Sequence, residues 1–320
     1  MSKMFYKLST FGFFILFSLN ILAEASFSED PKILLKNMHD ARKSLNYEMA
    51  FITTTANSIE ALRYRHINNG GIDYAQLVTL DEGMQEIIQR DNVISYFQPN
   101  YQAFSINGGQ IIDNFPSIMW SDIDSLAKNY DFVNFGRNRV ADRIVRTIRV
   151  LPKDDFRYQY LVFIDEENSL LLRSDVLDRE GNLLEQFRVV NLNMDNNLTA
   201  LFSYFNQIHF PPLLEDSTKQ NLSDISFNWT PTWLPEGFRL VNKSIISDNN
   251  NQIETLLYSD GLFSFNLYVS NGLIPNETEK ALQQGALTIY TNSQNNKELT
   301  FIGQLPISTA RRILQDIRFK

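Results

Sequence analysis

Short runs in which apolar and polar residues alternate dominate the first two thirds of this 320-residue chain. They lie at 47–51, 61–67, 74–80, 85–90, 93–98 and 101–106, and again at 131–135, 144–151, 158–165, 170–177 and 183–192. Within 61–67, Leu62, Tyr64 and His66 share one face, and Arg63 and Arg65 share the other. Runs about ten residues apart are typical of an antiparallel meander. The sequence therefore predicts one long antiparallel sheet.

A few helices are expected beside this sheet. Asp30 and Pro31 supply an N-cap and a proline at the first helical position, which predicts a helix from residue 31. Ser121 with Asp124 resembles a capping box for a short second helix, and Asn196 can cap a third. A long curved sheet needs cover on its concave face. We expect a half-barrel that is covered incompletely, with an apolar cleft suited to an acyl chain.

The composition changes near residue 211, which suggests a second domain. Pro211 and Pro212 end the third helix, and a polar stretch follows. We interpret 1–25 as a signal peptide, 26–210 as a large domain, 211–226 as a flexible linker and 227–320 as a small domain. Two domains joined by a modest interface are expected to move.

The small domain is expected to mix helices and strands. A helix near 277–284 ends at Gly285, a last helix is capped by Ser308, and strands are expected at 253–259, 262–269, 286–290 and 298–302. The predicted fold class is therefore α+β. It consists of a large antiparallel half-barrel sheet with helices on its concave side, plus a small α+β C-terminal domain.

The N-terminus predicts export. Lys3 and Lys7 precede an apolar run at 11–23, and Ala23 and Ala25 occupy the positions that a signal peptidase reads. The run is shorter than the roughly 20 residues that span a bilayer. We expect cleavage near Ala25–Ser26, a location outside the cytoplasm and no membrane-spanning segment.

Composition narrows the classes of function. The net charge is −8 and there are no cysteines, which argues against nucleic acid as a partner and removes thiol chemistry. His39, His66 and His209 show no metal-binding spacing, and no nucleophile elbow or phosphate-binding loop is present. We predict no catalytic residue, no cofactor and no metal. A carboxylate pair of a hydrolase on envelope sugars stays open as an alternative.

Two groups of residues are candidates for binding, and for each of them a core or ion-pair role is the alternative. The first group are apolar candidates for a lipid groove: Phe51, Leu62, Tyr64, Leu77, Tyr96, Phe104, Phe115, Met119 and Trp120. The second group are candidates for contact with a protein partner, either basic or apolar: Arg137, Arg139, Arg143, Trp229, Trp233, Leu234, Phe263 and Phe265.

Several long stretches lie in order along both halves of the chain: SLNYEMAF at Ser44, EALRYRH at Glu60, ISYFQPNYQAFSINGG at Ile94, YDFVNFGRNRVADR at Tyr130, DREGNLLEQFRVV at Asp178, HFPPLL at His209, NWTPTWLPEGF at Asn228 and YSDGLFSFNLYV at Tyr258. In these stretches the chain resembles the MucB/RseB family of periplasmic sigma-E regulators. The resemblance implies a lipoprotein-carrier-like half-barrel tied to a smaller domain. It also implies binding to the periplasmic part of a transmembrane anti-sigma factor, which is thereby shielded from regulated proteolysis.

The resemblance further implies release by lipids, misplaced lipoproteins or the acyl chains of lipopolysaccharide. The chain is thus expected to be a negative regulator of the envelope stress response and not an enzyme. A periplasmic lipid or lipoprotein carrier without a regulatory role is the alternative function. A homo-oligomer is possible from sequence alone.

Overall fold

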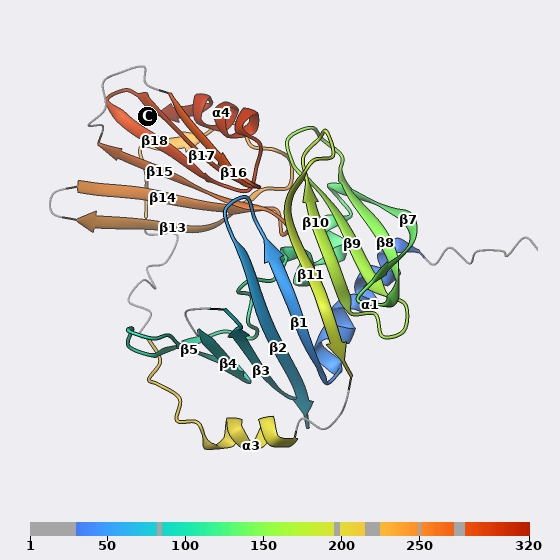
Figure 1. Cartoon of the computed structure of the whole chain (residues 1–320). Coiled ribbons are helices and arrows are strands. Elements are labelled where there is room, and N and C mark those ends of the chain that lie inside the picture. The colour runs from blue at the N-terminus through green and yellow to red at the C-terminus, as the bar shows by residue number, and fades with distance from the viewer. Residues whose placement is uncertain (1–29, 82–84, 195–198, 215–224, 249–250, 272–278) are drawn as a thin grey trace, which may run out of the picture.

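The computed structural model describes residues 30–81, 85–194, 199–214, 225–248, 251–271 and 279–320. The predicted signal peptide, the Asn196 cap and most of the predicted linker lie outside these residues. Figure 1 shows a large curved sheet joined to a second, smaller sheet.

The large sheet has eleven strands, and every neighbouring pair is antiparallel. The strands are β1 (Tyr47–Thr54), β2 (Ile59–Asn69), β3 (Ile72–Thr79), β4 (Glu86–Arg90), β5 (Val93–Phe97), β6 (Phe104–Asn107), β7 (Tyr130–Val140), β8 (Arg143–Pro152), β9 (Gln159–Asp165), β10 (Leu171–Leu177) and β11 (Leu183–Asn193). Their order is β6-β5-β4-β3-β2-β1-β11-β10-β9-β8-β7. The predicted meander is confirmed, and pairing of β1 with β11 joins its two halves.

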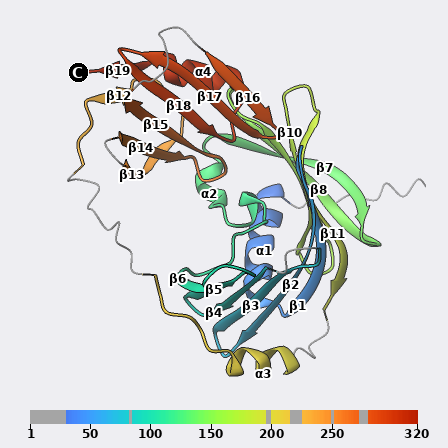
Figure 2. The same cartoon turned by 60° about the vertical axis from the view of Figure 1, so that its left-hand side comes forward.

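Helix α1 (Pro31–Ser44) lies in the concavity of this sheet, as Figure 2 shows. Asp30 caps it by accepting the backbone N–H of Lys32 at 2.9 Å, as the sequence predicts. Leu35 and Met38 are completely buried in the core between helix and sheet. The apolar stripe of α1 therefore covers the face that the alternating strands leave apolar.

The next two short elements also lie on the concave side. They are a 3-10 turn at Ser117–Met119 and α2 (Ile123–Leu126). The cap of α2 is Asp122, and the prediction of Ser121 as the cap is wrong. The Ser121 hydroxyl donates instead to the carbonyl oxygen of Gly261 at 2.7 Å, because this segment packs against the second sheet.

Helix α3 (Thr199–Gln207) lies on the opposite face of the large sheet. Phe205 is fully buried there and packs in a small separate core with Leu201, Ile67, Tyr74 and Ile88. Not every helix therefore covers the concave side. Tyr74 alternates with Ala75, which faces the main core, so this stretch of sheet is apolar on both faces.

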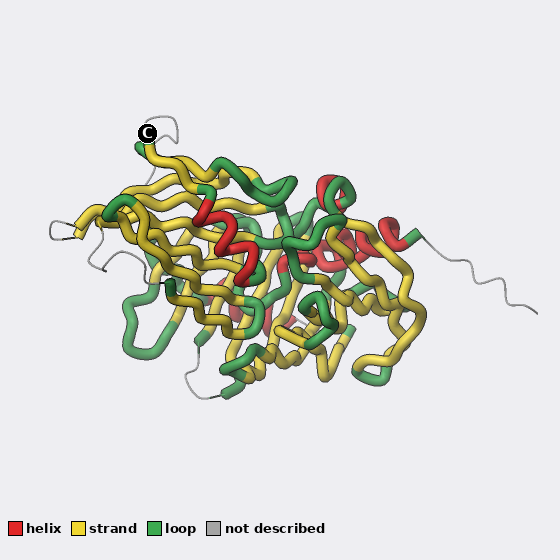
Figure 3. The backbone as a smooth tube through the Cα atoms, turned by 90° about the horizontal axis from the view of Figure 1, so that it is seen from above, coloured by secondary structure: helices red, strands yellow, loops and turns green. Residues whose placement is uncertain are grey.

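The second sheet has six strands in the order β13-β14-β15-β18-β17-β16. They are β13 (Arg239–Asp248), β14 (Asn251–Ser259), β15 (Ser264–Asn271), β16 (Lys280–Gln284), β17 (Leu287–Gln294) and β18 (Lys297–Gly303). Helix α4 (Ile307–Gln315) packs on β17 and β18 and crosses the sheet in Figure 3. A small ribbon of β12 (Trp229–Pro231) and β19 (Ile317–Phe319) completes this half.

Two predictions for this half are wrong in detail. The helix expected near 277–284 is the exposed edge strand β16 where the structure describes it, because Gly285 (φ +59°) allows a hairpin back to β17. Helix α4 begins at Ile307, and Pro306 rather than Ser308 occupies the N-cap. The predicted fold class as a whole is confirmed.

Candidate functional site

The lipid-groove candidates fill the concave side of the large sheet. Phe51, Leu62, Tyr64, Leu77 and Met119 are buried, whereas Tyr96, Phe104, Phe115 and Trp120 are half-buried. Their rings contact one another, with centroids 5.1 Å apart for Phe51 and Phe115 and 4.9 Å apart for Tyr64 and Phe115. The Arg42 guanidinium stacks on Trp120 at 4.1 Å. In this conformation the candidates form a packed core, and their role in lipid binding stays a prediction.

The basic partner candidates lie on or beside the β7–β8 hairpin and are all engaged within the chain. Arg137 contacts Glu166, Arg139 contacts Asp142 at 2.8 Å, and Arg143 contacts Asp165 at 2.6 Å. The exposed pairs of Arg137 and Arg139 contribute about 0–1 kcal/mol each, whereas Arg143 pairs with the buried carboxylate of Asp165. A partner would have to compete with these carboxylates for the arginines.

The apolar partner candidates of the second half divide into two sets. Trp229, Phe263 and Phe265 are buried in the core. Trp233 and Leu234 are half-buried, and the Trp233 ring packs against Phe156 at 4.9 Å. Of these five side chains, only Trp233 and Leu234 have exposed surface that a partner could contact without a rearrangement of the core. All five remain untested as binding residues.

A buried polar network joins the two sheets. Tyr130, at the start of β7, donates a hydrogen bond to Asp260 at 2.6 Å, and Nε of Arg157 lies 3.5 Å from the same carboxylate. Arg157 also donates to the carbonyl oxygen of Glu236. Both side chains of the ion pair are almost completely buried, at 1% and 0% exposure. Burial raises the pKa of Tyr130 well above its usual value, so its hydroxyl remains a donor.

Apolar and backbone contacts extend this network along the seam between the sheets. The Phe263 ring lies 5.5 Å from Tyr160, and Thr309 of α4 donates to the Phe156 carbonyl at 3.0 Å. A Cβ on Gly285 would lie 2.8 Å from the carbonyl oxygen of Leu184. The halves are therefore held in close contact, in contrast to the modest interface that the sequence suggests.

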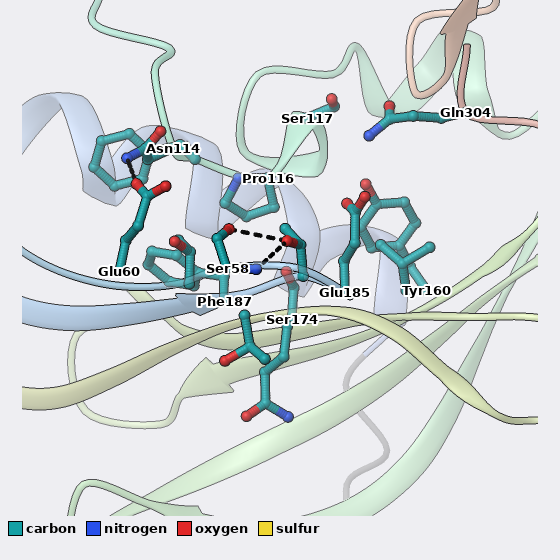
Figure 4. A pocket seen from close by; sticks show the side chains of 16 residues that line it. Ser58, Glu60, Asn114, Pro116, Ser117, Tyr160, Ser174, Glu185, Phe187 and Gln304 are labelled. Carbon is teal, nitrogen blue, oxygen red and sulfur yellow. Dashed lines mark hydrogen bonds between the residues drawn. The ribbon is translucent and has the colours of Figure 1, made fainter. Parts of the chain in front are cut away.

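A pocket of about 200 Å³ opens at this seam (Figure 4). Its walls come from the ends of β1 and β2, the segment 114–117, strands β9–β11 and Gln304 beyond β18. Among the lipid-groove candidates, only Phe115 lines it. Glu60, Ser174 and Glu185 also line it and were not identified from sequence, because the walls come from separate segments that no motif connects.

The volume of this pocket restricts its ligands. Sites for drug-sized ligands usually enclose about 300–1,000 Å³, and this pocket is smaller. It can hold a side chain or a small polar group as the structure stands. An acyl chain of membrane length needs further side chains to separate.

The residues that the structure describes contain no group of three or more histidines, aspartates and glutamates arranged to hold a metal ion. None of the helices among them has the length and apolar character to cross a membrane.

A curved antiparallel sheet around a helix, continued into a second sheet with a pocket at the seam, defines a two-sheet protein of the half-barrel class. The chain belongs to the MucB/RseB family. The MucB/RseB N-terminal domain matches residues 30–214, and the MucB/RseB C-terminal domain matches residues 223–318. The finer boundaries predicted above, at 210–211 and 226–227, remain predictions.

Similar proteins span almost the whole chain. The sigma-E factor regulatory protein RseB of Haemophilus influenzae is 52% identical over 310 residues, covering 96% of this chain and 98% of the relative. RseB of Escherichia coli K12 is 40% identical, and the match covers 100% of this chain and 99% of the relative. The structure of the Pseudomonas aeruginosa MucA/MucB complex matches with a TM-score of 0.70 and 22% identity, covering 91% and 99%. That last likeness shows the fold.

Proposed function

We propose that this protein is a negative regulator of the sigma-E envelope stress response. It binds the periplasmic domain of a transmembrane anti-sigma factor and shields that domain from regulated proteolysis. The observation that carries the proposal is the match of both family domains in order, together with a relative of 52% identity that bears the name of a sigma-E factor regulatory protein. The MucA/MucB complex supports a protein partner for this fold.

The mechanism we propose is occupancy. The protease can cut only those copies of the partner segment that are not bound to this protein. The rate of cleavage should therefore fall as the concentration of free regulator rises above the dissociation constant of the complex. No bond in the partner has to change. The two sheets supply a continuous surface around the seam, which is where segments from both halves lie side by side.

We also propose that lipids, lipoproteins or lipopolysaccharide weaken this complex through their acyl chains. A ligand changes the equilibrium only if it favours a conformation that binds the partner less well. The support is the apolar packing of the concave side, where Phe115 lies between the main core and the seam pocket. An acyl chain that separates Phe115 from Phe51 would disturb both regions together.

The proposed place of action is the periplasm. The N-terminal pattern of lysines, apolar residues and an A-x-A-like site supports export with cleavage near Ala25–Ser26. Detection of a mature chain that begins at Ser26 in a periplasmic extract would test this.

The decisive experiment is a protease-protection assay. The purified mature protein is mixed with the periplasmic segment of the anti-sigma factor from the same organism and with the first protease of the cascade. We expect cleavage to slow in proportion to occupancy and to recover when lipopolysaccharide or a diacylated peptide is added. Absence of a complex at tens of micromolar, with retained lipid binding, would favour the alternative of a periplasmic carrier.

A further inference from the structure

We propose that the seam pocket receives a basic side chain, a lysine or an arginine, of the bound protein segment, and that Glu185 supplies its counter-charge. The inference rests on the proposed function, because it names the chemistry by which this chain holds its partner. The pocket and its lining are independent of that function.

Glu185 is a half-buried carboxylate at the seam. It lies on β11 opposite Val176 of β10 and accepts a hydrogen bond from the backbone N–H of Ala286 in the second sheet. Among the described residues no lysine, arginine or histidine pairs with it. Burial raises the pKa of its carboxyl group, and the Ala286 N–H opposes that effect only in part. A cation placed here would relieve the desolvation of the charge.

The rest of the lining also presents acceptors. Glu60 enters from β2, with its Oε2 atom accepting from Nδ2 of Asn114 at 3.0 Å. Ser174 is only 2% exposed and lines the floor of the pocket (Figure 4). The pocket thus gathers two carboxylates and a serine hydroxyl, and no described lining residue is basic.

Aromatic rings form the apolar part of the lining. Phe115 and Phe187 stand 5.8 Å apart between their centroids, and Tyr160 lies beside Glu185 in Figure 4. Ring faces attract cations, and they also pack against the methylene stem of lysine or arginine. A volume of about 200 Å³ suits one such side chain.

Two other carboxylates of the large sheet have a cation within the chain. Asp175, on the strand that also carries Ser174, contacts Arg173 at 2.6 Å. Asp165 contacts Arg143 at 2.6 Å. The chain pairs half-buried and buried acids internally at these positions but not at Glu185. Glu86 also has no cation among the described residues, but it accepts hydrogen bonds from Gln76 and Tyr204. Glu185 has a single backbone donor, and a cation from another molecule would complete its surroundings.

The test uses the full mature protein and the anti-sigma segment, with affinity measured by calorimetry at about 50 mM salt, where charge pairing is weakly screened. We expect Glu185→Gln to weaken binding about tenfold, as for loss of a charge-assisted pair. Glu180→Gln removes the same charge from the exposed turn before β11 and is the matched control, with an expected change below about twofold. Thermal unfolding establishes that both variants are folded.

A second arm identifies the basic side chain. Each lysine and arginine of the segment is replaced by glutamine, and each product is titrated against the wild-type protein and Glu185→Gln. Replacement of one basic residue of the segment should weaken binding to the wild-type protein but not to Glu185→Gln. Such a loss of effect indicates that the basic residue and Glu185 interact directly.

The outcomes separate the two proposals. If Glu185→Gln binds the segment as tightly as the wild-type protein or more tightly, or if no basic residue of the segment is coupled to Glu185, the proposal that the pocket receives a basic side chain is wrong. The proposed regulatory function is not affected by that result. Failure of the wild-type protein to bind the segment at all rejects the proposed function itself.

Discussion

Glu185 and Asp260 are carboxylates at the same seam, but their surroundings differ. Asp260 accepts hydrogen bonds from Tyr130 and from two backbone N–H groups, and it faces Arg157. Glu185 has one backbone donor and no cation among the described residues. The first carboxylate is expected to stabilise the fold, whereas the charge on the second opposes folding. Each difference leads to a prediction.

Glu185→Gln should raise the melting temperature at neutral pH by a few degrees. The pKa of Glu185 is raised in the folded protein, so its ionisation weakens folding as the pH rises through that folded value. Below the ordinary carboxyl pKa of about 4.3, both states are protonated and the difference should vanish. Melting curves from about pH 4 to about pH 8, a range that includes the titration of a carboxyl group with a raised pKa, test this. A variant that is less stable than the wild-type protein at neutral pH would contradict it.

Asp260→Asn should destabilise the protein by about 3 kcal/mol, because it removes the buried charge that faces Arg157 and accepts from Tyr130. Among the described carboxylates, Arg157 then keeps only its contact with Asp154 at 3.2 Å. The matched control is Asp316→Asn, which weakens longer, partly exposed contacts with Arg312 and Arg318, each at 4.0 Å. The control should change the free energy of unfolding by less than about 1 kcal/mol. Urea denaturation measures both variants, and similar values for the two would show that the buried network contributes little.

At the scale of elements, helix α3 is attached to the large sheet through a small core of its own. Phe205 is fully buried in it, and the Tyr204 hydroxyl reaches Glu86 at 2.9 Å. This core lies on the face opposite α1 and is separate from the main core. The helix can therefore open locally without unfolding the seam.

Phe205→Ala should reduce the stability of α3 by about 3 kcal/mol, the lower end for removal of a buried ring. Tyr204→Phe is the neighbouring control and loses only an exposed hydrogen bond, with an expected effect below about 1 kcal/mol. Hydrogen exchange should show faster opening of 201–207 in the first variant. Affinity for the anti-sigma segment should not change, and a large loss of affinity would place the partner on this face.

Sequence patterns predicted the elements well where local signals and burial agree. Alternation identified the strands around Tyr64, and Asp30 with Pro31 marked the start of α1 correctly. The patterns failed at 280–284, where helix-forming residues occupy an edge strand because hairpin pairing across Gly285 overrides local propensity. The pocket could not be predicted, because Glu60 and Glu185 are brought together only by pairing of β1 with both β2 and β11.

At the scale of the whole molecule, the seam determines how the two sheets move. Its network involves a buried ion pair, a tyrosine hydroxyl and close backbone packing at Gly285. A small, polar interface would leave the halves free to rotate. The interface at the seam instead couples the two sheets. A signal that releases the partner must therefore either open the seam or act without changing the relative orientation of the sheets.

The wild-type protein should consequently unfold in a single calorimetric transition, with equal calorimetric and van't Hoff enthalpies. Asp260→Asn should separate this transition into two, since the coupling across the seam is weakened. Trp120 reports on the large sheet and Trp229 on the second half, so single-tryptophan versions distinguish the two events. Two transitions in the wild-type protein would contradict the coupling.

One further contact concerns the edge of the large sheet. Residue Leu213 forms a parallel bridge with Ser105 of β6, whose backbone N–H donates to Pro212 and whose carbonyl accepts from Leu214. The chain that leaves the large sheet thus occupies hydrogen-bonding positions which another polypeptide could otherwise use. The segment at Pro212–Leu214 therefore protects the β6 edge from pairing with a strand of another molecule. We expect that cutting or lengthening the connection between the two halves promotes aggregation, even if both cores stay intact.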